Sequence, residues 1–306
     1  MIQFNLPAKT FFVGEYAALY GGPALLVTTT PCFGITWSNK ITRHNESRLR
    51  GIHPDSPAGR WWLSSKHHRG ILEWQDPYQG RGGLGASSAQ FLGAFLASCH
   101  CLNQEPQLTD MFNAFQQTCK HEAGILPSGY DVLAQSQNQF VAINRQERVL
   151  QTYPWPFADI DFFLVHSGKK IQTHEHLKNI QLHASFIKEL SSIAHQTQMA
   201  FINTNSNQLI DSINAYSKSL FTNQLVTENT ITSLIAFHEC EYISASKGCG
   251  ALGADVLLLI TTRNDAAKLE AKLRDEQKLI LATSADIYRE KPILKNNPQK
   301  ALDFLL

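Results

Sequence analysis

The chain has 306 residues, a length that suits two domains of roughly 150 residues each. Its 27 Lys and Arg residues nearly balance 26 Asp and Glu residues, so the composition predicts neither a nucleic-acid partner nor binding to an anionic membrane. The longest apolar runs, such as Val256–Ile260, have the length of a strand and are too short to cross a bilayer.

The first residues and the cysteines indicate a compartment. Residues 1–6 lack the basic and then apolar pattern of a signal peptide. The six cysteines are scattered, and only Cys99 and Cys101 are close in sequence, on different faces of any helix. We therefore predict reduced thiols and a cytoplasmic protein.

Residues 3–37 predict strands and turns. An apolar run at Phe11–Val13 and another at Ala24–Val27 are separated by the turn signal Gly21-Gly22-Pro23. Lys9 puts a charge at the start of a strand that heads for the core, either as a solvated edge lysine or as a functional cation. Residues 39–79 are polar with strand-like pieces at 60–63 and 71–74, which predict hairpins and a lid-like loop.

A glycine-rich turn, Gly82-Gly83-Leu84-Gly85-Ala86-Ser87-Ser88-Ala89, runs into an apolar helix that we expect to begin near Ser87. Its glycines allow the backbone to approach a ligand closely, and the helix start favours an anion. The turn therefore predicts a site for nucleotide phosphates with a Ser hydroxyl available to Mg²⁺, or else a surface turn with a Ser cap. It is neither a Walker A loop nor a dinucleotide fingerprint, since no Lys follows and the Gly spacing differs.

A second helix is predicted over residues 108–123, with Gly124 as its C-terminal stop. The turn that follows, Pro127-Ser128-Gly129-Tyr130-Asp131, delivers a carboxylate. Beside a phosphate loop, a carboxylate can accept a hydroxyl proton or orient a neighbouring Lys. The same five residues also fit a capped turn without chemistry.

The run Tyr153-Pro154-Trp155-Pro156 breaks regular structure and predicts a domain junction, giving domains 1–155 and 156–306. Beyond it, strands are expected at 160–165, 255–261 and 279–282, and helices at 173–200, 209–220, 231–243 and 265–277. This alternation suggests an α+β sandwich of ferredoxin-like kind. A second glycine loop, Lys247–Asp255, opens the strand after it, and close approach to a ligand would explain its several glycines.

Taken together and in this order, the segments resemble the GHMP kinases, the small-molecule kinases that include galactokinase, homoserine kinase, mevalonate kinase and phosphomevalonate kinase. The three family motifs match residues 7–25, 83–89 and 247–255, and 127–131 resembles the segment of the catalytic acid. Ser167-Gly168 with Thr173 matches a further turn of the family. The resemblance implies an N-terminal α+β ATP-binding domain and a C-terminal ferredoxin-like domain, with the active site between them.

The resemblance also implies roles for single residues, with ATP and Mg²⁺ as cofactors and a small molecule as substrate. Asp131 would take or steer the proton of the acceptor hydroxyl, and Lys9 would stabilise the developing charge. The remaining predicted ligands divide by what they bind. ATP would contact Gly82, Gly83, Leu84, Gly85, Ala86, Ser87 and Ser88; the acceptor would contact Glu15, Tyr16, Ser128, Gly129 and Gly250; Mg²⁺ would contact Ser87 and Glu122.

The acceptor remains open between mevalonate and 5-phosphomevalonate. Tyr16, the Tyr130-Asp131-Val132 spelling and Asp255 resemble phosphomevalonate kinase, whereas residues 20–25 and 127–129 resemble mevalonate kinase. Three departures, Ala86, Leu252 and Ala254, also permit a kinase for another alcohol, such as a sugar or homoserine, or a sensor that binds nucleotide without turnover. A monomer or a homodimer is compatible with the sequence.

Overall fold

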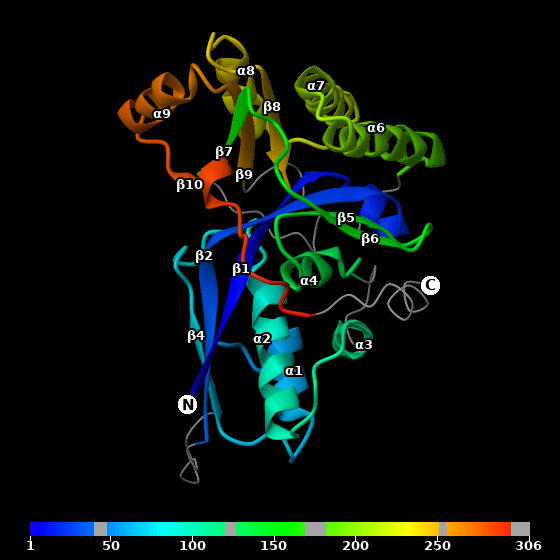
Figure 1. Cartoon of the computed structure of the whole chain (residues 1–306), viewed down its shortest axis with the longest axis vertical. Helices are drawn as coiled ribbons and strands as arrows, with labels where there is room; N and C mark the ends of the chain where they lie inside the picture. The colour runs from blue at the N-terminus through cyan, green and yellow to red at the C-terminus, as the bar shows by residue number, and fades with distance from the viewer. Residues whose placement is uncertain (40–47, 120–126, 169–181, 251–255, 295–306) are drawn as a thin grey trace.

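The computed structural model describes residues 1–39, 48–119, 127–168, 182–250 and 256–294. Within these residues the chain forms two sheets, each with its own helices, which follow one another along the longest axis of the molecule (Figure 1). The predicted α+β fold class is therefore confirmed.

The first sheet has six strands in the described residues, in the order β3-β4-β2-β5-β6, with β1 paired to β2. The strands are β1 (Ile2–Val13), β2 (Ala24–Ser38), β3 (Leu49–Arg50), β4 (Ile71–Gln75), β5 (Phe140–Asn144) and β6 (Val149–Tyr153). The long strand β2 pairs with β1 on one edge, and its other edge pairs first with β5 and then with β4. Pro31, which has no N–H to donate, lies between those two paired stretches.

The helices of the first half pack beside this sheet, and α2 runs along β1 and β2 (Figure 1). They are α1 (Pro57–Leu63), α2 (Ala86–Cys101), α3 (Leu108–Cys119) and α4 (Tyr130–Gln135), with a short 3₁₀ turn η1 (Ala17–Tyr20). The predicted helix after the glycine turn is thus confirmed and begins at Ala86, one residue before its expected start.

Two predictions for residues 48–79 are wrong. Residues 60–63, predicted as a strand, belong to α1 because Ser56 caps the helix and Pro57 occupies its first turn; Ser56 Oγ accepts from the Gly59 N–H at 3.1 Å. The expected hairpin is absent from the described residues, since β3 runs parallel to β4. The predicted strand at 71–74 is confirmed as β4.

The second sheet has the strand order β10-β7-β9-β8, and all of its neighbouring strands are antiparallel. Its strands are β7 (Ile160–His166), β8 (Ala245–Cys249), β9 (Val256–Thr262) and β10 (Ile280–Thr283). Its helices are α6 (Ala184–Ile202), α7 (Ser206–Thr222), α8 (Glu228–His238) and α9 (Ala266–Asp275). Helices between β7 and β8 and between β9 and β10 give the βαββαβ order of the predicted ferredoxin-like sandwich.

Most elements predicted for the second half are confirmed, with three differences. The helix predicted over 173–200 is described only from Ala184, and Thr173 lies outside the described residues. The segment Lys247–Asp255 is not a loop throughout, because its first three residues belong to strand β8. The predicted helix at 231–243 ends earlier, at His238.

Trp155 and its neighbours join the two halves. The Trp155 ring lies 5.4 Å from that of Phe140 in the first sheet and 5.2 Å from that of Phe162 in the second, between ring centroids. Phe201 of α6 adds a third contact at 5.8 Å. We name these four rings, with Phe12 and Phe157, the aromatic cluster. Its members come from both sheets, so the sheets share one core.

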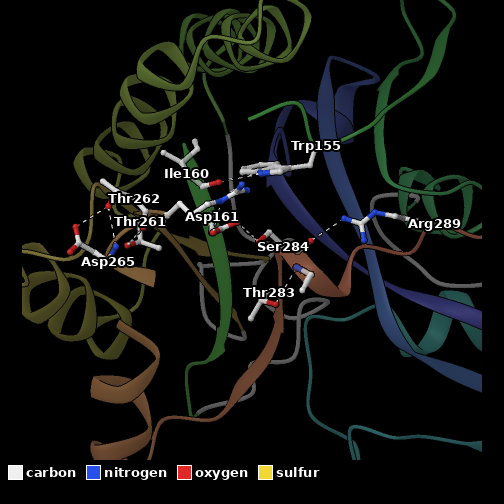
Figure 2. A network of polar contacts seen from close by, with 11 residues as sticks. Trp155, Ile160, Asp161, Thr261, Thr262, Asp265, Thr283, Ser284 and Arg289 are labelled. Atoms are coloured by element: carbon white, nitrogen blue, oxygen red, sulfur yellow. Dashed lines mark hydrogen bonds and ion pairs between the residues drawn. The ribbon is translucent and has the colours of Figure 1, made fainter. Parts of the chain in front are cut away.

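The chain after β10 returns to the first sheet. In Figure 2, Ser284 of the 3₁₀ turn η3 (Ser284–Asp286) donates to Asp161 of β7 at 2.6 Å, and Arg289 donates to the Ser284 carbonyl. Beyond this turn, Tyr288 bonds to the backbone of Thr28 and Gln139, 2.9 Å in each case. Residues 287–294 therefore run from strand β2 of the first sheet to the end of α4, where Leu294 bonds to Ser136.

Candidate active site

Lys9 and Asp131 meet in the fold although they are far apart in sequence. Lys9 comes from β1 and Asp131 from the first turn of α4, and Lys9 Nζ lies 2.9 Å from Asp131 Oδ1. The Lys9 side chain is 8% exposed, whereas that of Asp131 is 41% exposed. Oδ1 makes no hydrogen bond to a described residue, so the contact is an ion pair held by charge. The Asp131 side chain is thus partly open to solvent, while its Oδ1 is buried against the Lys9 ammonium.

The turn before α4 fixes the position of Asp131. Gly129 has φ +76°, in the left-handed region, and a Cβ there would lie 2.4 Å from Phe112 Cε2. A residue with a side chain would therefore need both a strained backbone and a displaced ring. Ser128 Oγ accepts from the Tyr130 N–H at 3.3 Å, which closes the turn.

Tyr130 anchors the other face of the same helix. Its hydroxyl donates to the Gly22 carbonyl at 2.8 Å and accepts from the Arg145 N–H at 3.0 Å. Burial raises the pKa of Tyr130 to about 12, so the phenol stays neutral and keeps its donor. Since Tyr130 precedes Asp131 directly, these bonds hold the carboxylate against β1.

The glycine turn, residues 82–85, sits directly on Lys9. Gly85 has φ +82° and is the N-cap of α2. A Cβ at Gly85 would lie 2.8 Å from Lys9 Cγ and 2.9 Å from Gln135 Nε2. The Lys9 N–H also donates to the Leu84 carbonyl at 3.0 Å. The predicted phosphate loop and the predicted catalytic pair are therefore in direct contact.

The first turn of α2 contains two serines with different surroundings. Ser88 is buried and its hydroxyl donates to the Gly85 carbonyl at 2.9 Å. Ser87 is exposed, one residue past the half-buried Ala86. The Ala89 N–H makes the first hydrogen bond of the helix, to the Gly85 carbonyl, so the N–H groups of residues 86–88 have no acceptor within the helix. The helix start thus offers N–H groups and one exposed hydroxyl to an anion or its counterion.

Of the two predicted Mg²⁺ ligands, Ser87 fits the ion. Mg²⁺ bound with nucleotide phosphates needs only one or two protein oxygens, and the exposed hydroxyl of Ser87 is of the right type. Glu122, the other predicted ligand, lies outside the described residues. No group of three or more His, Cys, Asp or Glu side chains gathers in the described parts of the chain.

Glu15 pairs with Lys247 in a second buried contact. Lys247 Nζ lies 2.6 Å from Glu15 Oε1, and it also donates to the carbonyl of the next residue, Gly248, at 2.9 Å. The Lys247 side chain is 0% exposed and that of Glu15 is 6% exposed. This pair ties strand β8 of the second sheet to the end of β1, and the Tyr216 ring of α7 lies 5.2 Å from the ammonium.

Burial sets the charges in this second cluster. It raises the pKa of Tyr216 well above its usual value, helped by the charge of Glu15, and it raises the pKa of Cys249 to about 11. Burial alone would lower the pKa of Lys247, but Cys249 and Glu15 outweigh it and raise that pKa. Lys247 therefore keeps its positive charge, and the phenol of Tyr216 stays neutral.

The remaining predicted site residues are scattered around these two contacts. Tyr16 is buried, whereas Glu15 reaches into the interface with β8. Gly250 follows β8 with φ +85°. Leu252, Ala254 and Asp255 lie outside the described residues.

Two residues of the site, Lys247 and Gln135, were absent from the predicted site residues. Gln135 is fully buried and contacts both β1 and the glycine turn. It follows Asp131 by four positions on α4, so the two side chains share a helix face. That spacing could have indicated it.

Known structures resemble the whole chain. A mevalonate kinase from Methanococcus jannaschii matches with a TM-score of 0.73 at 15% identity, covering 94% of this chain and 98% of that one. A Streptococcus pneumoniae phosphomevalonate kinase, in complex with phosphomevalonate and AMPPNP, matches with a TM-score of 0.73 at 14% identity, covering 92% and 99%. A Lactococcus lactis galactokinase complexed with galactose gives 0.71 at 11% identity, covering 95% and 93%.

The chain has the GHMP kinase fold. No protein-family model and no curated protein matches its sequence. Identities of 11–15% show a shared fold only. The three solved structures are kinases that act on different substrates, so the fold does not identify the acceptor. None of the described helices is both long and apolar enough to span a bilayer.

Proposed function

We propose that this protein is an ATP-dependent kinase of a small-molecule alcohol. The observation that carries the proposal is the Lys9–Asp131 ion pair, 2.9 Å long, with Gly85 packed against the Lys9 side chain. It unites an acid, an amine and a glycine turn at a helix start, which are the parts that phosphoryl transfer needs.

In the proposed reaction the acceptor hydroxyl gives its proton to Asp131 as its oxygen bonds to the γ-phosphorus of ATP. The bond between that phosphorus and the β,γ-bridging oxygen breaks, and ADP leaves with the electron pair. Lys9 orients the Asp131 carboxylate, and its positive charge stabilises negative charge on the transferred group. Mg²⁺, held through Ser87, would neutralise charge on the phosphates when bound.

We propose mevalonate or 5-phosphomevalonate as the acceptor, which would assign the enzyme to the mevalonate pathway in the cytoplasm, as a monomer or homodimer. Two observations support this choice. The sequence motifs resemble both kinases, and structures of both share the fold over more than nine-tenths of this chain. A galactokinase and a homoserine kinase of the same fold keep a sugar or homoserine as the alternative.

An acceptor panel tests the proposal. Purified protein is given ATP and Mg²⁺ with mevalonate, 5-phosphomevalonate, galactose or homoserine, ADP release is followed, and the product is identified by mass. Asp131→Asn protein, prepared identically, measures any contaminating kinase. We expect turnover with one of the first two acceptors. Turnover only with galactose or homoserine would overturn the acceptor, and nucleotide binding without any turnover would favour the sensor.

A further inference from the structure

Gln135 connects three segments that the proposed reaction uses. It is the last residue of α4, the helix that carries Asp131, and it is fully buried at 0% exposure. Its Nε2 donates to the Pro7 carbonyl of β1 at 2.8 Å and to the Gly85 carbonyl of the glycine turn at 3.1 Å. One side-chain amide thereby links the helix, the strand of Lys9 and the predicted phosphate loop.

The two carbonyls fix the orientation of the amide. A glutamine side chain can be turned so that its oxygen and nitrogen exchange places, and the hydrogen-bond network decides between the two. In the reverse orientation Oε1 would face two carbonyl oxygens, which repel it. With Nε2 facing them, both amide protons find acceptors, and Oε1 is buried without a hydrogen bond to a described residue.

The bond to Gly85 constrains the glycine turn at the point where it becomes a helix. The Gly85 carbonyl accepts from the Ala89 N–H at 2.9 Å, from Ser88 Oγ at 2.9 Å and from Gln135 Nε2 at 3.1 Å. The neighbouring Leu84 carbonyl accepts from the Lys9 N–H at 3.0 Å. Successive carbonyls of the turn are thus held by β1 and by α4, the elements that carry Lys9 and Asp131.

We propose that Gln135 is a positioning residue that sets the distance between the glycine turn and the Lys9–Asp131 pair. The inference rests on the proposed kinase function and adds a residue that the family motifs do not contain. Because Gln135 is fully buried, it would act without contacting ATP or the acceptor. It acts by keeping the turn in register with the pair, because phosphoryl transfer depends on alignment within about 1 Å.

Gln137 supplies a matched control. It is also a buried glutamine, 2% exposed, and its Nε2 also donates to a backbone carbonyl, that of Leu294 at 3.2 Å. Its second acceptor is Ser136 Oγ at 3.0 Å, so none of its side-chain bonds reaches the glycine turn. Gln135→Met and Gln137→Met therefore remove similar buried hydrogen bonds at different places.

The experiment compares the two variants with wild-type protein in three measurements. Hydrogen exchange of residues 82–89 should be roughly tenfold or more faster in Gln135→Met and unchanged in Gln137→Met. Affinity for a non-hydrolysable ATP analogue should fall about tenfold, and kcat should fall roughly 10- to 100-fold, only in Gln135→Met. The KM of the acceptor should stay unchanged in both. Gln135→Asn, too short to reach both carbonyls, should repeat this pattern if the Met variant folds poorly.

Equal behaviour of Gln135→Met and Gln137→Met in exchange and nucleotide affinity would overturn the positioning role, since both would then be ordinary buried amides. Hydrogen exchange needs no turnover, so it tests the inference even if the kinase proposal fails. A wild-type protein inactive with every acceptor, in which Gln135→Met still loosens residues 82–89, would refute the function and leave the link intact.

Discussion

Lys9 and Asp131 are the residues on which the proposed chemistry depends. We expect Asp131→Asn and Lys9→Met each to lower kcat about 10³-fold, because a positioned acid–base group contributes about 10²- to 10⁴-fold. Nucleotide affinity should change little, since both groups act on the transition state. Steady-state kinetics and titration with an ATP analogue measure the two quantities separately.

A loss confined to nucleotide affinity in either variant would contradict these roles. The Asp131 side chain is 41% exposed and its Oδ1 makes only the ion pair. Asp131→Asn leaves the buried Lys9 ammonium without this carboxylate, so the thermal midpoint should fall, and kinetics measured well below the new midpoint separate a chemical defect from unfolding.

The Lys247–Glu15 pair should matter for stability. Lys247→Met leaves the Glu15 carboxylate buried without its partner, and breaking a buried pair typically costs about 3–5 kcal/mol. The double variant Lys247→Met with Glu15→Gln should recover most of that loss because no buried charge is left unpaired. Urea unfolding of the single and double variants gives the coupling free energy.

An exposed ion pair serves as the control for this cycle. Lys272 and Glu276 on α9 lie 2.9 Å apart, and both are about two-fifths exposed. Lys272→Met should leave the free energy of unfolding almost unchanged. Strictly additive losses at Lys247 and Glu15 would mean that the two side chains do not stabilise each other.

Site residues that belong to a sequence motif could be predicted, whereas those that are defined by a tertiary contact could not. The motifs pointed to Lys9, Asp131 and Gly85, which the structure brings into contact. The partner of Glu15 could not be read from the sequence, because Lys247 reaches it only after two sheets have packed. Gln135 shares a helix face with Asp131, but its partners are backbone carbonyls that any sequence supplies, so its role could not be read from the sequence.

At the scale of elements, the glycine turn and α2 act as one unit pressed against β1. Gly85→Ala would place a Cβ 2.8 Å from Lys9 Cγ, in addition to the strain of φ +82°. We expect it to lower kcat at least tenfold and to cost more than the strain alone, which is about 1 kcal/mol. Kinetics and urea unfolding of the variant test both parts.

Gly80→Ala is the matched control, because Gly80 has φ +79° and a Cβ there meets nothing within 4 Å. It should lose about 1 kcal/mol of stability and keep its kcat. If Gly85→Ala and Gly80→Ala behaved alike, the close approach of the turn to Lys9 would have no consequence for activity.

Local sequence patterns predicted most element types correctly, except where a helix cap favoured a different element. The apolar run at 60–63 predicted a strand, but the Ser56 cap and Pro57 start a helix just upstream. Strand β8 was not predicted because its segment contains several glycines, which sequence patterns associate with loops. Its strand character comes from pairing with β9, a tertiary effect.

At the scale of the whole molecule, we expect the aromatic cluster to couple the unfolding of the two sheets. Trp155→Ala removes the ring that contacts Phe140 and Phe162 and should cost about 3 kcal/mol. Because the ring belongs to both halves, amide protection in β5 and β9 should fall together. Native-state hydrogen exchange measures each strand separately.

Trp74→Ala provides the comparison, since Trp74 stacks on Phe33 within the first sheet alone, at 5.1 Å between centroids. Its loss should affect β4 before it affects β9. Faster exchange in only one half of Trp155→Ala would mean that the two sheets open independently.

The return of residues 287–294 to the first sheet has a consequence for how the chain matures. Thr28 and Gln139 bond to Tyr288, and Ser136, next to Gln135, bonds to Leu294. A ribosome makes these partners after every strand of the second sheet. The backbone groups of Thr28, Ser136 and Gln139 that bond to residues 287–294 therefore stay open to water until that segment has been made.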